Sequence, residues 1–484
     1  AGVIFAEMKF RSISRIRQEN PRGVKVAVSM ILYAAAVIAP FPSCDQATAL
    51  MQDAYRKAFS STRKTWASTG YPYMRETVEI SGRFSSRTNG KPDIILVMME
   101  SFNANFVEAK TPDGREITPV FNRLLKTGLY YDRFYGNSIQ TCKGQATTLL
   151  SVLPSFRNKI FTSYPNLRFK ALPSYLADAG YDTLFMQAEP KLTFDNTGSF
   201  MKRAGFADIR SACEWISKED ADKTWGRGPE DGLFYETFFE YLDRRKAKTG
   251  GKPVFALLAT IANHMRFDQM PESRKMLYPG SATIEQNYAN SLHLSDRQLG
   301  DLMRLISQRP YLANAIIIIT SDHSYPINEH GISFNENGFY DESFRIPFLI
   351  LWKGRIAPQR ISDCAHSQVD IAPTILDLAA IHGGPNSFIG KSLFLKNGPC
   401  NPVYLIQPYN GTYLQSIRYP YKYIHSRKTD EEYVFNLISD PSEKNNLIRQ
   451  DPADLLSRMR KDLETIYFNQ HILDMNALHK EEGR

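Results

Sequence analysis

Side chains that commonly bind metal ions follow two apolar runs of the sequence. The run IILVMM (94–99) is followed by Glu100, and AIIIIT (315–320) is closely followed by Asp322 and His323. In open α/β sheets ligands bind beyond the carboxyl ends of the strands, so these side chains are expected at one sheet edge. Two carboxylates and an imidazole there would suit one divalent cation of the Mn²⁺, Zn²⁺ or Mg²⁺ kind. Taken singly, a strand-end Glu is better explained by a helix cap or a surface charge, and an Asp-His pair is common by chance.

The segment NSIQTCKGQATTLLSVLPS (137–155) offers a nucleophile. A polar turn precedes a short apolar helix expected over 146–153, which places Thr141 near the first turn, where free N–H groups and the helix dipole favour an anion. Beside a divalent cation this hydroxyl could lose its proton and attack a phosphoryl group, while Lys143 holds the phosphate oxygens. On local sequence alone an N-cap role for Thr141 is favoured. Cys142 is a second candidate nucleophile.

A third apolar run, PVFALLA (253–259), is followed by His264 and Arg266 in the segment TIANHMRFD. An imidazole and a guanidinium at this sheet edge would suit a phosphate ester and its leaving group. Placement of either side chain in the core or on the surface is an equally good interpretation.

These candidates need a sheet to position them, and the chain from Asp93 onward has the pattern of one. Short Ile-, Val- and Leu-rich runs alternate with amphipathic stretches, which is typical of strands buried on both faces, so we predict a doubly wound, mostly parallel α/β sheet. The runs cover 94–99, 181–187, 253–259, 315–320 and 346–352. After Pro402 alternating aromatic segments predict a small antiparallel sheet, closed by a helix near 455–467.

The 484-residue chain divides into four predicted parts. We expect a basic segment and a transmembrane helix over 1–44, a polar helical connector over 45–92, a catalytic core over 93–401, and a C-terminal subdomain with a tail over 402–484. The run 26–41 is uncharged and follows a stretch rich in Lys and Arg, so the core would lie outside the cytoplasm. A buried helix or a signal-peptide hydrophobic region is the alternative interpretation.

Composition excludes several classes of protein. A hydrophobic fraction of 43% and a charged fraction of 23% are ordinary globular values, which excludes disordered and collagen-like chains. The net charge of +8 indicates an anionic partner such as phospholipid, phosphorylated polymer or nucleic acid. Nucleic acid is the least favoured, because Lys and Arg are dispersed and no aromatic–basic module is present.

The cysteines carry little information. Their spacing contains no CxxC pair, which excludes zinc-ribbon and thioredoxin-type sites. In an oxidising compartment Cys364 could pair with Cys400, or Cys142 with Cys213, and the sequence decides neither.

Taken in order, these motifs resemble the sulfatase-like branch of the alkaline phosphatase superfamily, and within it lipoteichoic acid synthases and periplasmic phosphoglycerol transferases. The resemblance runs from about Asp93 to Leu447. It is carried by the segments ESF, TPVFNRL, FYGNSIQTCKG, FDNTGSFMKRAGF, WGRGPEDGLF, ANHMRFD, TSDHS, RIPFLI and SQVDIAPTILDLAAI, and by the closing YKYI and YVFNLISDPSEKNNL.

The resemblance implies roles for individual residues. Glu100, Thr141, Asp322 and His323 would bind one divalent ion, usually Mn²⁺. Thr141 would be the nucleophile, and His264 would contact the phosphoglycerol group. The implied reaction moves a glycerophosphoryl group from an anionic membrane phospholipid to a glycan, polymer or lipid hydroxyl through a phospho-threonine. The catalytic domain would lie on the periplasmic or extracellular side of the cell membrane.

One departure concerns substrate binding. Where lipoteichoic acid synthases have a Trp-Asn-Arg element that helps to hold the substrate phosphate, this chain has Asp195, Asn196 and Thr197. Arg203 or Arg227 could substitute for the missing arginine. The predicted substrate-binding residues are Lys143, Asn196, His264 and Arg266.

Other functions on the same fold remain open. A phosphodiesterase or phosphonate hydrolase would use water as the acceptor. A phosphoethanolamine transferase would use a similar threonine, although such enzymes usually carry several disulfides. A catalytically silent, membrane-tethered protein that binds anionic polymer is a further alternative. Sulfate-ester hydrolysis through formylglycine is disfavoured, because Cys142 is followed by Lys-Gly-Gln-Ala and not by x-Pro-x-Arg.

Overall fold

A computed structural model describes residues 75–84, 90–156, 159–164, 167–334, 337–395, 400–450 and 453–475. The predicted transmembrane segment over 26–41 and most of the predicted connector lie outside these residues. Within the described ranges, none of the helices has both the length and the apolar composition needed to cross a bilayer.

The predicted mostly parallel sheet is confirmed, and it has eight strands in the order β11-β2-β10-β9-β1-β8-β4-β5. Strand β10 is antiparallel to both of its neighbours, and the other pairs are parallel. The strands are β1 (Ile94–Met99), β2 (Leu129–Tyr131), β4 (Asp182–Gln187), β5 (Asp208–Ser211), β8 (Val254–Ala259), β9 (Ile316–Ser321), β10 (Phe348–Leu351) and β11 (Gln359–Ile361). The five predicted runs are β1, β4, β8, β9 and β10, whereas the short strands β2, β5 and β11 were not predicted.

Both faces of the sheet are buried under helices, which explains why the central strands are continuously apolar. Along β1, Ile94, Leu96 and Met98 belong to one core cluster, and the alternate side chains belong to another. The first face is covered by α5 (Thr141–Leu150), α7 (Leu172–Asp178), α8 (Thr197–Ala204) and α11 (Ile371–Leu378). The second face is covered by α4 (Pro119–Leu124), α9 (Asp231–Lys248) and α10 (Ile284–Ser307).

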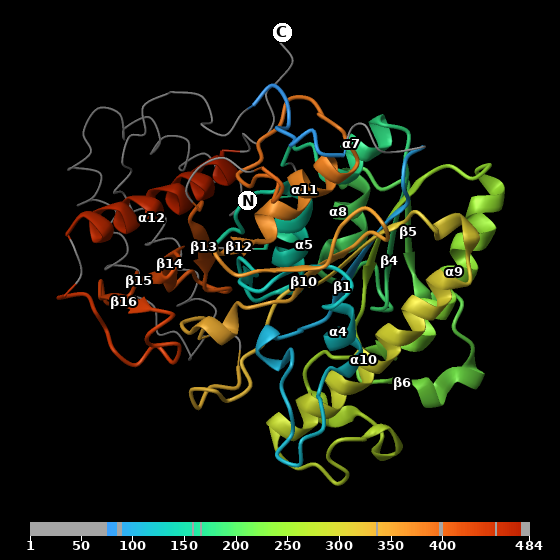
Figure 1. The fold of residues 1–484 in the computed structure, drawn as a ribbon, viewed down its shortest axis with the longest axis horizontal. Helices are drawn as coiled ribbons and strands as arrows, with labels where there is room; N and C mark the ends of the chain where they lie inside the picture. The colour runs from blue at the N-terminus through green and yellow to red at the C-terminus, as the bar shows by residue number, and fades with distance from the viewer. Residues whose placement is uncertain are drawn as a thin grey trace, which may run out of the picture. The chain divides into compact units, whose positions relative to one another are not determined.

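The predicted C-terminal antiparallel sheet is also confirmed. Its strands are β13 (Val403–Ile406), β14 (Tyr413–Arg418), β15 (Tyr421–Ser426) and β16 (Glu432–Asn436), in that order. Helix α12 (Ala453–Asp474) runs along this sheet and packs Met459, Leu463 and Ile466 against it (Figure 1).

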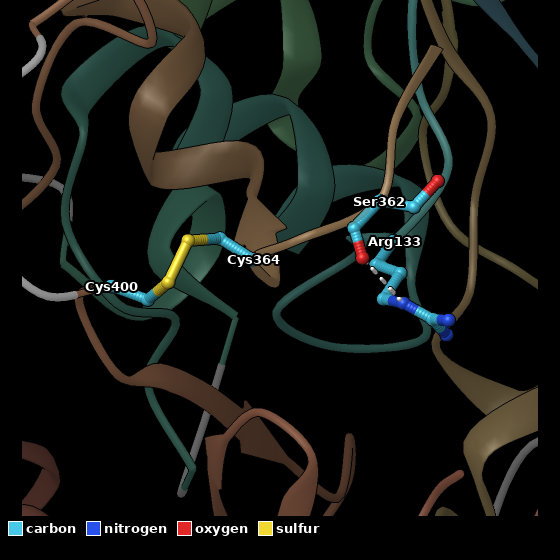
Figure 2. The surroundings of a disulfide bond; sticks show 4 residues. All are labelled: Arg133, Ser362, Cys364 and Cys400. Atoms are coloured by element: carbon cyan, nitrogen blue, oxygen red, sulfur yellow. Dashed lines mark hydrogen bonds between the residues drawn. A yellow bond between two sulfur atoms is a disulfide. The ribbon is translucent and has the colours of Figure 1, made fainter.

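A disulfide joins Cys364 to Cys400, with the two Cα atoms 5.7 Å apart (Figure 2). It connects the segment before β12 (His366–Ser367) to the segment before β13. Cys142 and Cys213 are free thiols. Of the two pairings that the sequence left open, the structure therefore contains the first.

Candidate active site

Glu100, Asp322 and His323 meet at the carboxyl edge of the sheet. Glu100 directly follows β1, the other two directly follow β9, and these two strands pair in parallel. One ligand atom from each residue lies within 4.8 Å of the others. Nε2 of His323 is 3.5 Å from Oε1 of Glu100 and 3.4 Å from Oδ2 of Asp322. All three side chains are buried.

Hydrogen bonds with neighbouring groups orient each of these three side chains. Oδ1 of Asp322 accepts from the backbone N–H groups of Ser101 at 3.0 Å and His323 at 2.8 Å. Oε1 of Glu100 accepts from the Ser101 hydroxyl at 2.7 Å. Nδ1 of His323 donates to the carbonyl of Ser324 at 2.7 Å, because a carbonyl can only accept. The lone pair on Nε2 therefore faces the two carboxylates.

The remaining atoms fit a bound cation. Oε2 of Glu100 and Oδ2 of Asp322 are buried without a hydrogen-bond partner among the described residues. Burial, together with the negative charge of Asp322, raises the pKa of Glu100 well above its ordinary value. Two buried carboxylates that face each other are costly unless a positive charge offsets them. With an imidazole lone pair beside them, they form a suitable ligand set for one divalent metal ion.

Thr141 is the first residue of α5, and its Oγ1 lies 3.5 Å from Nε2 of His323. Gln140 occupies the N-cap position that the sequence favoured for Thr141. The close approach depends on Gly144, because a Cβ atom there would lie only 1.9 Å from the carbonyl oxygen of Asp322. The first turn of α5 therefore packs directly against the backbone that carries Asp322 and His323.

A pocket opens beside Thr141 and Glu100, and His264 is part of its wall. Nδ1 of His264 donates to the carbonyl of Met265, so that Nε2 is left as an acceptor. Burial lowers the pKa of His264, and the positive charge of Arg227 adds to this effect. The lowered pKa favours the neutral imidazole, which can accept a proton.

Three predicted substrate-binding residues lie outside the lining of this pocket. Nζ of Lys143 donates to the carbonyl of Pro408, next to the C-terminal sheet. Nδ2 of Asn196 donates to the carbonyl of Phe161 at 2.9 Å. The Arg266 side chain is 72% exposed, and its charged partner is a carboxylate 3.8 Å away.

Sequence reasoning missed other residues of the pocket wall. Glu189, Phe194 and Asp195 line the pocket together with Arg227. Glu189 lies two residues beyond β4, so the rule that selected the other strand ends would also have found it. Of the two arginines suggested as substitutes, Arg227 lines the pocket and Arg203 does not.

Residues 92–381 match the family model described as Sulfatase. The lipoteichoic acid synthase-like protein YvgJ of Bacillus subtilis (strain 168) is 23% identical over 405 residues, which cover 81% of this chain and 61% of that protein. A lipoteichoic acid synthase of Staphylococcus aureus (strain USA300) is 24% identical over 405 residues, which cover 77% of this chain and 56% of that protein. The chain thus spans about three fifths of the length of these curated relatives.

Two solved structures share the fold. A protein in the alkaline phosphatase superfamily from Vibrio parahaemolyticus has a TM-score of 0.69 at 20% identity, covering 91% of this chain and 98% of that one. The lipoteichoic acid synthase LtaP from Listeria monocytogenes has a TM-score of 0.65 at 19% identity, covering 83% of this chain and 97% of that one. Because the family model matches more than half of its residues, the chain belongs to the sulfatase family of enzymes.

Proposed function

We propose that the protein is a metal-dependent phosphoglycerol transferase. It would move a glycerophosphoryl group from an anionic membrane phospholipid to a hydroxyl of a glycan, a polymer or another lipid. The observation that carries this proposal is the position of the Thr141 hydroxyl, 3.5 Å from His323 and beside two buried carboxylates. The likeness to lipoteichoic acid synthases supports glycerophosphate as the transferred group.

Glu100, Asp322, His323 and the Thr141 hydroxyl would together hold one divalent cation, with Mn²⁺ as our first choice and Zn²⁺ or Mg²⁺ as alternatives. When bound, this ion lowers the pKa of a coordinated hydroxyl and offsets charge on phosphate oxygens. Ser101 and Ser324 fix the orientation of the ligands through the hydrogen bonds described above.

In the first step Oγ1 of Thr141 attacks phosphorus, and an O–P bond forms as the ester bond to diacylglycerol breaks. Neutral His264 takes the threonine proton and delivers it to the departing oxygen, so that diacylglycerol leaves as an alcohol. In the second step an acceptor hydroxyl attacks the glycerophosphoryl-threonine. The proton of the acceptor returns to Oγ1 of Thr141, and the glycerophosphoryl group is then esterified to the acceptor.

We place the catalytic core on the outer side of the cell membrane. The Cys364–Cys400 disulfide supports this location, because disulfides persist in oxidising compartments and are rare in the cytosol. The uncharged run over 26–41 and the basic stretch before it support a membrane anchor. The proposed partners are therefore a phospholipid donor and an envelope glycan or polymer, with no role for nucleic acid.

Labelled lipids test this function against its rivals. Membranes that carry the protein are incubated with phosphatidylglycerol labelled in the head-group glycerol or in the acyl chains, and in parallel with phosphatidylethanolamine labelled in ethanolamine. We expect the glycerol label to appear on a glycan, polymer or lipid acceptor and the acyl label to appear in diacylglycerol. A water-soluble product alone would indicate a hydrolase. Transfer of the ethanolamine label would indicate a phosphoethanolamine transferase.

A further inference from the structure

Arg227 reaches the pocket from the end of a tight hairpin. The strands β6 (Thr224–Trp225) and β7 (Gly228–Pro229) pair antiparallel, and they leave Gly226 and Arg227 as the two loop residues. Gly226 has a φ of +57°, a conformation that the favoured two-residue hairpin loops require. The arginine therefore sits on a short connection with little freedom to move.

Gly228 fixes this hairpin against the sheet edge. A Cβ atom at this position would lie 2.7 Å from Cγ2 of Ile261 and 2.8 Å from the carbonyl oxygen of Ala188. Ala188 follows β4, and Ile261 follows β8, next to β4 in the sheet. The hairpin thus packs directly on two of the segments that line the pocket, the ones that follow β4 and β8.

Glu189 and Phe194 orient the guanidinium of Arg227 and leave some of its N–H donors unused. Nη2 and Nε donate to Oε2 of Glu189 at 2.7 and 3.1 Å, and the guanidinium carbon lies 4.4 Å from the centre of the Phe194 ring. Nη1 has no hydrogen-bond partner among the residues that the structure describes. A guanidinium has five N–H donors, so several remain for an anion in the pocket.

The charges around the pocket cancel in pairs. Arg227 neutralises Glu189, and Nζ of Lys159 lies 2.6 Å from Oδ2 of Asp195 on the same wall. A single divalent cation would offset the carboxylates of Glu100 and Asp322. The pocket wall with its cation is therefore close to neutral, and what remains for a ligand with one negative charge is the set of unused N–H donors on Arg227. A second negative charge on the ligand would face Glu189 and Asp195, with no unpaired cation among the described residues that line the pocket.

We propose that Arg227, oriented by Glu189 and Phe194, binds the free oxygens of a phosphodiester monoanion, and that Glu189 disfavours phosphomonoester dianions. This inference rests on the proposed function for the reaction and adds the substrate class of the same pocket. Arg227 is a binding residue in this scheme, and Glu189 is a positioning residue that also sets charge selectivity.

Binding measurements on the full-length, Mn²⁺-loaded protein in detergent test this proposal. The probes are glycerophosphoglycerol, a monoanionic diester, and glycerol 1-phosphate, a dianion at about pH 8, with affinities measured by calorimetry. Arg227→Met is expected to weaken glycerophosphoglycerol binding by roughly tenfold or more. Arg203→Met is the matched control, because Arg203 also lies over phenylalanine rings but outside the pocket, and we expect no change.

Glu189→Gln separates a charge role from a structural one. It keeps a side chain of the same shape and removes the negative charge, so we expect the preference for the diester over the monoester to fall by roughly threefold or more. A general loss of structure would weaken both probes alike and leave the preference unchanged.

Unchanged glycerophosphoglycerol affinity in Arg227→Met, or an unchanged preference in Glu189→Gln, would overturn the inference. If Arg227→Met does not fold, Arg227→Gln replaces it as the neutral variant under the same criterion. Failure of the proposed function would give a different result. Labelled glycerol would then reach no acceptor in the transfer assay, whereas the Arg227 variants would still bind glycerophosphoglycerol more weakly.

Discussion

The hydroxyl oxygen of Thr141 lies 3.5 Å from Nε2 of His323, although the two residues are 182 positions apart in the sequence. One residue begins a helix on the sheet face, and the other follows the strand β9. Their contact therefore depends on how α5 packs against the carboxyl edge of the sheet, and it places a hydroxyl beside a cluster of groups that could hold a metal ion.

Thr141→Ala should abolish transfer of the glycerol label without unfolding the protein. Alanine is favourable in a helix, and Thr141 makes its described side-chain hydrogen bond with His323. We expect a melting temperature close to that of the unchanged protein, while Thr141→Ser, which keeps the hydroxyl, should retain part of the activity. Transfer activity in the alanine variant with Mn²⁺ present would remove the covalent step from the scheme.

Removal of metal should lower stability as well as activity. The partnerless oxygens of Glu100 and Asp322 are buried together, so a chelator leaves two charges facing each other, and a ligand that binds only the folded state stabilises it. We expect a lower melting temperature in chelator and recovery when Mn²⁺ is added back.

Glu100→Gln provides the control for this metal experiment. The substitution removes one of the two buried carboxylates, and burial together with the negative charge of Asp322 raises the pKa of Glu100. Without metal, the variant should therefore have a higher melting temperature than the wild-type protein. Added Mn²⁺ should raise the melting temperature of the variant only slightly. If Mn²⁺ stabilises both proteins equally, the ion binds elsewhere.

Gly144→Ala should damage the site through backbone packing alone. The added Cβ atom would lie 1.9 Å from the carbonyl oxygen of Asp322, which requires a backbone shift. We expect a loss of about 1–3 kcal/mol in the free energy of unfolding, and a larger relative loss of activity, since α5 must move away from the metal-binding residues.

Gly300→Ala is the matched control for this glycine substitution. Gly300 lies within the helix α10, where a Cβ atom would meet Val120 at an ordinary 3.6 Å. Alanine there should stabilise the protein by about 0.5–1 kcal/mol. Equal effects of the two substitutions on activity would contradict the packing argument, and both are measured by urea denaturation and the label-transfer assay.

The positions of Glu100, Asp322 and His323 could be predicted because a strand end fixes a residue at the sheet edge. The prediction that Lys143 binds the substrate phosphate came from its place near a helix start and not from a strand end, and Lys143 lies outside the pocket lining. Residues two apart on a helix point to different sides, so if Thr141 faces His323 then Lys143 must face elsewhere. Arg227 lies on a hairpin of two-residue strands, too short for a hydrophobic pattern, and its approach to the pocket depends on the tertiary contacts of Gly228.

Folding stability should fall as the pH drops below the ordinary pKa of histidine, and His366 should cause part of this fall. Burial lowers the pKa of His366 to about 4 from an ordinary value of 6.5. Between these pH values the unfolded chain binds a proton that the folded protein does not bind, so stability increases with pH across this window and is lost as the pH falls from 6.5 to 4. The contribution of this single group to the free energy of unfolding reaches up to about 3 kcal/mol.

The His366→Gln variant tests this contribution. The substitution should flatten the dependence of stability on pH in this window, as measured by urea denaturation at each pH. NMR titration of the imidazole gives its pKa directly. A measured pKa near 6.5, or the same pH dependence in the variant, would show that other groups are responsible.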